Sequence, residues 1–266
     1  MDGTLLDTVC CIPERNIEAI EKAINQGVII VPTTGRCYRN TKMILGDLQG
    51  ISYYVTSNGA IVSDDSKQEI IYEKVMAKEQ AKAVHELTKK YSVFVEIYAG
   101  LDTYVDNKGI DNLYRSALKT EHCDQILISP EKVEDLSMVI NDDSISVNKY
   151  YIVFEKGETS ATLLDEIAGI DGLYPIAPTA DTIEVISGKW SKRDGLEKLI
   201  GKLGIAREEV MVIGDSDNDY EMMEWSSNAV AMGNAPDRIK ELANYITATN
   251  NEAGVAQAIQ ELVLWS

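Results

Sequence analysis

The sequence predicts an α/β fold in which a doubly wound parallel sheet is interrupted by an inserted α+β domain. Near both ends of the chain, short apolar runs typical of buried strands alternate with segments of helical periodicity, and the connections are short. The middle of the chain has a different pattern, with alternating strands and interspersed helices. We therefore expect a core domain built from residues 1–76 and 188–266, and an α+β cap formed by residues 77–187.

The amino-terminal part is expected to form one helix followed by strands. Residues 13–26 have isoleucines at helical spacing, begin with a proline and are followed by Gly27, which suits a helix end. The apolar run 28–31 is typical of a buried parallel strand. Another strand is expected at 53–56, before the Asn-Gly turn, and a small hairpin at 61–72.

The insert is expected to contain a one-sided sheet with helices. Residues 78–91 have helical spacing, and the alternation over 93–98 predicts a half-exposed strand. The other expected elements are strands at 103–106 and 149–154 and helices near 110–119 and 158–168.

After residue 182 the predicted strands and helices follow one another strictly. They are, in order, strand 183–186, helix 191–203, strand 210–213, a helix from about 217, strand 229–232, helix 236–242, strand 245–247 and helix 252–262. Ligands of doubly wound sheets bind beyond the carboxyl ends of the strands, so functional residues are expected directly after strands.

Composition and charge exclude several classes of protein. The 266 residues carry a formal net charge of −18, which argues against a nucleic-acid surface and requires a local cation at any phosphate site. No apolar stretch approaches the length of a membrane span. The four cysteines have no paired or zinc-binding spacing, which favours a reduced, cytoplasmic protein. Separately, we expect a monomer or a small homo-oligomer.

The strongest local signal is the stretch Gly-Asp-Ser-Asp-Asn-Asp at 214–219, directly after a predicted strand. Carboxylates this close together repel one another, and a hard cation would relieve the repulsion. An EF-hand loop is excluded because Tyr220 and Ser226 stand where such a loop has Gly and Glu. The alternative is a helix start with acidic residues in its first turn.

Three further motifs are weak when taken alone. Asp2-Gly3-Thr4 is a common turn sequence, and Thr34-Gly35 can be a polar strand end or a phosphate-binding turn. Lys192, at the start of helix 191–203, can be a surface lysine or a cation at an anion site.

Taken together and in this order, the four motifs resemble the haloacid dehalogenase superfamily. The phrases Ser-Asn-Gly-Ala at 57–60, Met-Gly-Asn-Ala at 232–235 and Asn-Glu-Ala-Gly-Val at 251–255 are similar to its Cof-like phosphatases. The insert, placed between the Thr-Gly-Arg and lysine motifs, resembles the large α+β cap of that group, and the resemblance covers essentially the whole chain. The core domain would then be the Rossmann-like core of this superfamily.

The resemblance implies a Mg²⁺-dependent phosphatase that acts on a small phosphorylated metabolite, such as a sugar phosphate, a nucleotide or a cofactor phosphate, through an aspartyl-phosphate. It implies that Asp2 is the general acid and base. The other implied roles are Asp2, through its backbone carbonyl, Asp215 and Asp219 for the metal, and Thr34, Gly35, Lys192 and Asn218 for the phosphoryl group.

The resemblance also places a nucleophilic Asp two positions before Asp2, with Met1 between them. We therefore expect that the first strand and the nucleophile are missing from the sequence as given. Residues 1–266 alone should have little or no phosphatase activity, and a version extended upstream should be active. Two alternatives remain open, namely a phosphotransferase or phosphomutase on the same scaffold, and a metal- or phosphate-binding module without turnover.

Overall fold

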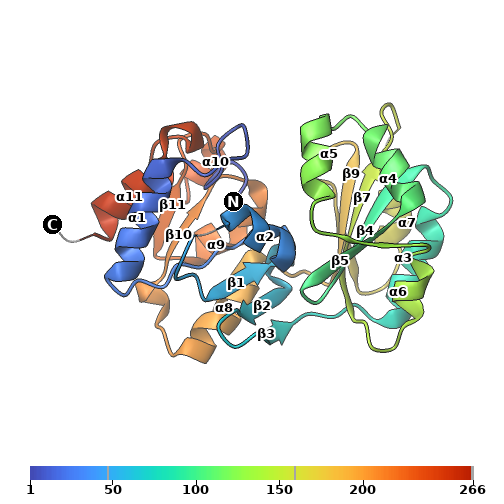
Figure 1. Cartoon of the computed structure of the whole chain (residues 1–266), viewed down its shortest axis with the longest axis horizontal. Helices are drawn as coiled ribbons and strands as arrows, with labels where there is room; N and C mark the ends of the chain where they lie inside the picture. The colour runs from blue at the N-terminus through green and yellow to red at the C-terminus, as the bar shows by residue number, and fades with distance from the viewer. Residues whose placement is uncertain (47, 159, 265–266) are drawn as a thin grey trace. The chain divides into compact units, whose positions relative to one another are not determined.

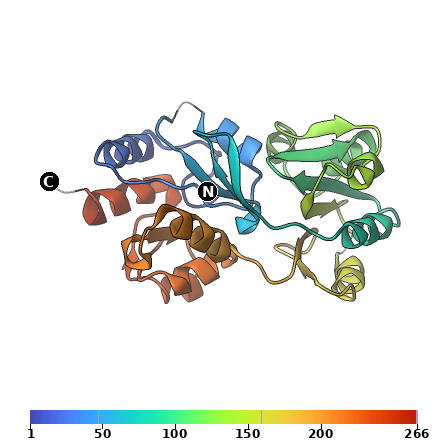
Figure 2. The same ribbon diagram turned by 90° about the horizontal axis from the view of Figure 1, so that it is seen from below.

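The computed structural model describes residues 1–46, 48–158 and 160–264, and the chain divides into two compact units (Figures 1 and 2). The first unit comprises Met1–Gly35, Ile44–Tyr72 and Ser191–Ser266, and the second comprises Arg36–Met43 and Glu73–Trp190. This division differs from the expected core and cap boundaries mainly at Arg36–Met43, a segment that packs with the second unit.

The first unit contains two separate three-stranded sheets and the helices around them. One sheet has the order β1 (Tyr53–Thr56), β2 (Ile61–Asp64), β3 (Glu69–Glu73), and the other is parallel, with the order β10 (Met211–Gly214), β11 (Asn228–Ala231), β12 (Tyr245–Ile246). The helices are α1 (Glu14–Asn25), α8 (Lys192–Leu203), α9 (Tyr220–Trp225), α10 (Asp237–Lys240) and α11 (Gly254–Leu262), while α2 (Tyr38–Leu45) lies across the division between the units.

The strand predicted at 28–31 is not formed, and this prediction was wrong. Within the described part of the chain, the only pairing near it is an isolated parallel bridge from Thr33 to Val55. Among the strands of the described residues, β10 pairs on one side only, with β11. The physical reason is that a buried strand needs partners for its backbone groups on both sides. Ile29 is accordingly 48% exposed, although it belongs to an apolar run.

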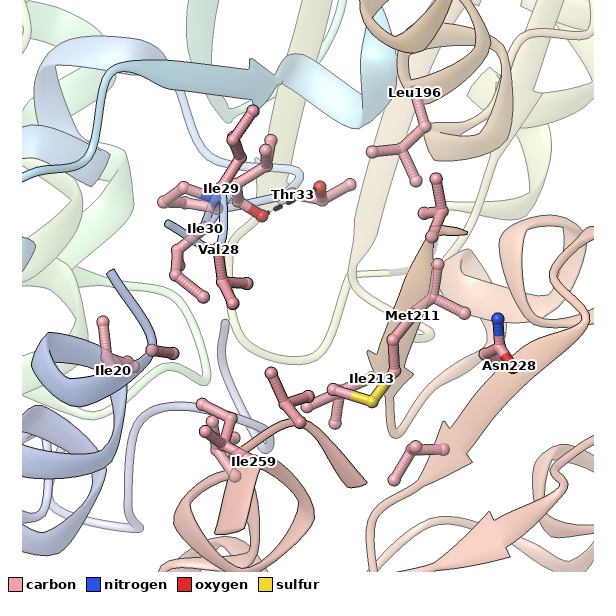
Figure 3. A pocket seen from close by; sticks show the side chains of 18 of the residues that line it. Ile20, Val28, Ile29, Ile30, Thr33, Leu196, Met211, Ile213, Asn228 and Ile259 are labelled. Atoms are coloured by element: carbon pink, nitrogen blue, oxygen red, sulfur yellow. Dashed lines mark hydrogen bonds between the residues drawn. The ribbon is translucent and has the colours of Figure 1, made fainter. Parts of the chain in front are cut away.

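Between this segment and β10 lies an apolar cavity of about 860 Å³ (Figure 3). Figure 3 shows Val28, Ile29 and Ile30 along one side of the cavity and Met211 and Ile213 along the other. The expected single parallel sheet is therefore divided into two sheets at this position.

The second unit is built on one six-stranded sheet. Its strand order is β6 (Glu131–Val133), β5 (Asp102–Asp106), β4 (Val93–Ala99), β7 (Val147–Phe154), β9 (Thr182–Ser187), β8 (Leu173–Ile176). Its helices are α3 (Lys78–Thr88), α4 (Asn107–Tyr114), α5 (Thr120–Ile126), α6 (Ser137–Asn141) and α7 (Ala161–Ala168). Strand β9, which we expected to open the parallel succession, pairs here antiparallel with β7 and β8. The helix predicted at 158–168 includes Thr159, which lies outside the described residues.

The prediction of a half-exposed strand at 93–98 was also wrong, because β4 is buried along its whole length. One face of the sheet belongs to the cluster that contains Val95 and Ile97, and the opposite face belongs to the cluster that contains Phe94 and Leu113 of α4. Helices therefore cover both faces, so alternation along β4 separates two cores instead of core and solvent.

Strand β4 also carries a buried acid. Glu96 is 3% exposed, and burial raises its pKa to about 7 against the opposing effects of Thr103 and the charge of Lys149. Lys149 is buried as well, and its Nζ lies 2.8 Å from Oε1 of Glu184. The second unit thus encloses charged groups that the sequence analysis did not single out.

No helix within the described residues is long and apolar enough to cross a membrane.

Candidate active site

Lys192 occupies the first turn of α8 and points into the first unit. Ser191 precedes the helix, and its backbone N–H donates to Oδ2 of Asp194 at 2.8 Å, which caps the helix start. Lys192 is 3% exposed, and its Nζ donates to Oδ1 of Asn218 at 2.8 Å and to Oδ1 of Asp219 at 2.7 Å. The local cation that an acidic chain needs at a phosphate site is therefore buried and fixed in place.

The loop after β10 is organised by Asp219. Its Oδ2 accepts the backbone N–H groups of Asp215 at 3.0 Å and Ser216 at 3.1 Å, while its Oδ1 faces Lys192. Burial, the largest single effect, would raise the pKa of Asp219, but the charges of Lys192 and the Met1 amino group and the hydrogen bonds from Lys192 and the Asp215 backbone together hold this pKa below its usual value. A side chain on Gly214 would place its Cβ 2.7 Å from the Cβ of Asp219, so the close approach requires glycine.

Asp215 meets the Asp-Gly-Thr loop at the amino-terminal end of the described chain. The hydroxyl of Thr4 donates to Oδ1 of Asp215, and a Cβ on Gly3 would lie 2.2 Å from Oδ2 of the same carboxylate. Burial raises the pKa of Asp215, the bond from Thr4 opposes this, and the charge of Asp219 adds to it. The carboxylates of Asp215 and Asp219 thus lie close together, and their negative charges repel one another. A divalent cation between them would offset this repulsion.

Met1 and Asp2 lie in the same electrostatic field. The Met1 amino group is buried, and burial followed by the charge of Lys192 lowers its pKa, against the charges of Asp219, Asp2 and Asp215. The Asp2 side chain itself is exposed. The end of the Asp-Gly-Thr loop therefore faces the buried charges of the site.

Thr34 is bonded to the turn that follows β1, and this turn packs on the start of α8, which carries Lys192. It is 2% exposed, its N–H donates to the carbonyl of Val55 at 2.9 Å, and its carbonyl accepts from the N–H of Asn58 at 3.0 Å. Gly59 packs on the start of α8, because a Cβ there would lie 2.2 Å from the carbonyl oxygen of Ser191. Gly35 lies against the same turn, and its Cβ would be 2.7 Å from Oδ1 of Asn58.

The sequence analysis assigned no role to two asparagines that hold the Asp-Gly-Thr loop. Nδ2 of Asn234 donates to the carbonyl of Gly3 at 2.8 Å, and Nδ2 of Asn250 donates to the carbonyl of Leu6 at 2.9 Å. The backbone N–H of Asn250 donates to Oδ1 of Asn234 at 2.9 Å, so the two residues act together. The only signal in the sequence was that Asn234 belongs to a phrase noted for its family resemblance.

The site residues suit a single hard cation that is held by few carboxylates, and they do not form a ready-made cage of several carboxylates. Within the described residues, no group of three His, Cys, Asp or Glu side chains is arranged to hold a metal ion. Asp215 fits the role of ligand, since it is a half-buried carboxylate whose pKa is raised by desolvation. Asp219 fits a supporting role, because both its oxygens already accept from Lys192 and the loop backbone.

Comparisons with known proteins identify what this arrangement is similar to. Residues 1–259 match the sequence pattern of the haloacid dehalogenase-like hydrolases. A putative phosphatase of Bacillus subtilis (strain 168) is 28% identical, with 99% of this chain and 96% of the relative covered. A 5-amino-6-(5-phospho-D-ribitylamino)uracil phosphatase of the same organism is 30% identical, with 99% and 94% covered.

Solved structures have the same fold over nearly the whole chain. A haloacid dehalogenase-like hydrolase from Bacteroides thetaiotaomicron is 25% identical with a TM-score of 0.83, and the match covers 98% of this chain and 96% of that one. The subclass IIB sugar phosphatase BT4131 is 25% identical with a TM-score of 0.77, covering 98% and 95%. The α/β fold with a cap domain is therefore confirmed.

Proposed function

The chain belongs to the family of haloacid dehalogenase-like hydrolases, and on this premise we propose that it is a Mg²⁺-dependent phosphatase of small phosphorylated metabolites. One observation supports the proposal most, namely that Lys192, Asp215 and Asp219 lie together against the Asp-Gly-Thr loop. Because the chain has a net charge of −18, an anionic ester needs a local cation where it binds. The buried ammonium group of Lys192 would supply this positive charge.

The proposed reaction has two displacements. A carboxylate oxygen of the nucleophilic Asp, which the motif places two positions before Asp2, attacks phosphorus. The bond from phosphorus to the leaving oxygen breaks, and Asp2 donates its proton to that oxygen. Asp2 then takes a proton from the water whose oxygen attacks the aspartyl-phosphate. The bond between phosphorus and the carboxylate oxygen breaks, and inorganic phosphate is released.

The remaining residues bind and orient the phosphoryl group. An ammonium group has three N–H donors, and Lys192 gives two of them to Asn218 and Asp219, so the third can meet a phosphoryl oxygen. Because the amide oxygen of Asn218 accepts from Lys192, its NH₂ group is turned to act as a second donor. The hydroxyl of Thr34 and the backbone of Gly35 complete the proposed phosphate site.

Mg²⁺, when bound, would neutralise charge on the phosphoryl oxygens and hold the phosphate in position. The residues proposed to hold it are Asp215 and the backbone carbonyl of Asp2, with Asp219 supporting them directly or through water. The raised pKa of Asp215 supports this assignment, since a cation would favour its ionised form.

The test is phosphate release in the presence of Mg²⁺. A chain extended upstream with an Asp two positions before Asp2 should hydrolyse small phosphate esters, and residues 1–266 alone should show little or no turnover. In the extended chain, Asp2→Asn and Lys192→Met should each lower kcat by about 100-fold or more. Asp217→Asn, an exposed acid of the same loop, is the control and should keep activity. Turnover by residues 1–266 that depends on Asp2, or full activity of Asp2→Asn, would refute the assigned roles.

The substrate panel combines the substrates named for two relatives with the further classes that the family resemblance implies. It should include sugar phosphates, 5-amino-6-(5-phospho-D-ribitylamino)uracil, nucleotides, pyridoxal phosphate and flavin mononucleotide. Transfer of the phosphoryl group to an added acceptor alcohol, with no release of phosphate, would instead identify a phosphotransferase. Stabilisation by Mg²⁺ or phosphate without any turnover would identify a binding module.

A further inference from the structure

Two of the four cysteines are adjacent in sequence and lie at the surface of the first unit. Cys10 is half-buried and Cys11 is exposed, whereas Cys37 and Cys123 are buried, at 2% and 1% exposure. All four are free thiols. Free cysteines usually behave as small buried hydrophobic side chains, so an adjacent pair in contact with solvent is unusual. The proposed phosphatase mechanism uses neither thiol of this pair.

The loop 7–11 that carries the pair is held in shape by Asp7. Its Oδ1 accepts the backbone N–H groups of Val9 and Cys11, both at 2.9 Å. The backbone closes the loop as well, because the N–H of Asp7 donates to the carbonyl of Cys11 at 2.9 Å and the N–H of Cys10 donates to the carbonyl of Asp7 at 3.1 Å. The two thiols are therefore carried by an ordered turn.

The backbone at Cys10 adopts a conformation that a residue with a side chain seldom takes. Its φ angle is 63°, and positive φ angles outside glycine occur most often at functional sites. The Sγ of Cys11 lies 3.8 Å from the carbonyl oxygen of Val9, so this thiol is turned back toward the peptide group that precedes Cys10. The N–H of Thr8 donates to Oδ1 of Asn251 at 3.0 Å, which anchors the loop to the carboxyl-terminal part of the unit.

The spacing of the pair suits a bridging ion better than a direct disulfide. Disulfides usually join residues whose Cα atoms lie about 4.4–6.8 Å apart. The Cα atoms of adjacent residues joined by a trans peptide bond are only about 3.8 Å apart, so a direct bond between Cys10 and Cys11 would be strained. An ion between the two sulfurs lengthens the bridge by one atom and removes this constraint.

The number of ligands narrows the choice of ion. Structural zinc takes four protein ligands, and iron–sulfur clusters are usually held by four cysteines. Among the residues that the structure describes, no group of three or more His, Cys, Asp or Glu side chains is arranged to hold a metal ion. An ion at this pair must therefore be content with two thiolates. Soft thiolate ligands select Cu(I), which forms stable complexes with two of them.

We propose that Cys10 and Cys11 form a two-thiolate binding site for a soft monovalent cation, of which Cu(I) is the one that fits. On binding, each thiol releases its proton to solvent and one bond forms from each sulfur to copper. The copper stays in the cuprous state, so the step needs no oxidant and no reductant. The net charge of −18 attracts cations to the chain, and the release of protons makes binding tighter as pH rises.

The experiment is an anaerobic titration of residues 1–266 with Cu(I), in competition with the chromogenic chelator bicinchoninate. One equivalent of Cu(I) per chain is expected. Cys10→Ser and Cys11→Ser should each lower the affinity by about 100-fold or more, and the double variant should bind no more weakly than either one, because a single substitution already removes the chelate. The double variant Cys37→Ser with Cys123→Ser, which leaves the adjacent pair as the only thiols, is the matched control and should keep the parent affinity.

Asp7→Ala tests whether the ordered loop contributes to the site. This variant keeps both thiols, but its affinity for Cu(I) should fall by about tenfold because the loop must then be ordered on binding. The urea midpoint of each variant shows that it is folded. Parent affinity in Cys10→Ser or Cys11→Ser, or loss of binding in the folded control variant, would overturn the inference. Half an equivalent of Cu(I) per chain, accompanied by a dimer in gel filtration, would also overturn it, since the ion would then be shared between two chains.

Discussion

At the scale of single residues, the buried pair of Lys192 and Asp219 sets the charge balance of the site. The two side chains are 3% and 4% exposed and lie 2.7 Å apart, so neither interacts with bulk water. Removing one partner of such a pair leaves an uncompensated buried charge, which commonly destabilises a protein by about 3–5 kcal/mol. The pair therefore has a structural role as well as its proposed role in binding phosphate.

Asp215→Asn should stabilise the protein while abolishing its response to Mg²⁺. The pKa of Asp215 is raised in the folded state, so its stabilising contribution is present below the unfolded pKa and is lost as pH rises through the folded pKa. At neutral pH the variant should be more stable than the parent in urea unfolding, and at pH 3 it should match the parent. Mg²⁺ should raise the midpoint of the parent only. A Mg²⁺ response that survives the substitution would contradict the assignment of Asp215.

Glu96→Gln should remove a pH dependence of stability that arises in the second unit. The pKa of Glu96 rises from 4.5 to about 7, so the protonated acid stabilises the fold at low pH and this contribution is lost between about pH 4.5 and 7. At pH 8 the variant should be more stable than the parent by about 2–3 kcal/mol, and at pH 4 the two should agree. Glu79→Gln on the exposed side of α3 is the matched control and should show no such difference.

The residues with their own chemistry could be predicted from sequence, and the residues that position them could not. Asp215 and Asp219 were found because carboxylates crowd the turn after a predicted strand. Asn234 and Asn250 act by donating to backbone carbonyls of residues more than 200 positions away, and a local pattern contains no information on such a partner. The roles assigned to the site residues themselves remain predictions until activity is measured.

At the scale of elements, the turn after β1 packs against Gly35 of the Thr-Gly-Arg segment and against the start of α8. Ser57 and Asn58 adopt positive φ angles of 54° and 55°, and Gly59 has a φ of 89°. This rare succession turns the chain so that Gly59 touches the carbonyl of Ser191. The position of Lys192 thus depends on a backbone contact that only glycine permits.

Gly59→Ala should destabilise the first unit far more than Gly27→Ala. Both glycines have positive φ angles, 89° and 86°, so both substitutions carry the same backbone strain of about 1 kcal/mol. Only at Gly59 would the new Cβ meet backbone atoms, 2.2 Å from the carbonyl oxygen of Ser191, whereas nothing lies within 4 Å at Gly27. An additional loss of at least about 2 kcal/mol in urea unfolding is expected for Gly59→Ala. Equal losses for the two variants would show that the contact with α8 is unimportant.

Most helices and strands of the first unit could be predicted from local patterns, as α1, β1, α8 and β11 show. Their caps, apolar spacing and strand lengths are local properties of the sequence. The failure at 28–31 has a non-local cause, since strand formation depends on neighbours on both sides. The failure at β4 is similar, because alternation does not distinguish a solvent face from a second apolar core.

At the scale of the whole molecule, each unit has a hydrophobic core of its own. The largest cluster of the second unit includes Ile97 and Tyr150, and the clusters of the first unit draw on different residues, such as Leu199 and Ala256. Units with separate cores can open separately.

Ile97→Ala should therefore destabilise one unit selectively. Ile97 is fully buried in the second unit, and its truncation should lower local stability by about 2–5 kcal/mol. Hydrogen exchange should accelerate at the amides of β4 and β7 while those of β10 and β11 stay at the parent rate. Leu199→Ala in α8 is the reciprocal control, with the opposite pattern. Uniform acceleration in both units would show instead that the chain unfolds as one cooperative body.

The hydrogen bonds from Asn234 and Asn250 that hold the Asp-Gly-Thr loop determine when this loop can become ordered during synthesis of the chain. The loop is translated more than 200 residues before the two side chains that hold it, Asn234 and Asn250. The contiguous stretch 73–190 can meanwhile collapse around its own core as it emerges. The candidate active site is thus completed only after residue 250 has been made, and a nascent or prematurely terminated chain that stops before residue 234 contains the loop without the groups that order it.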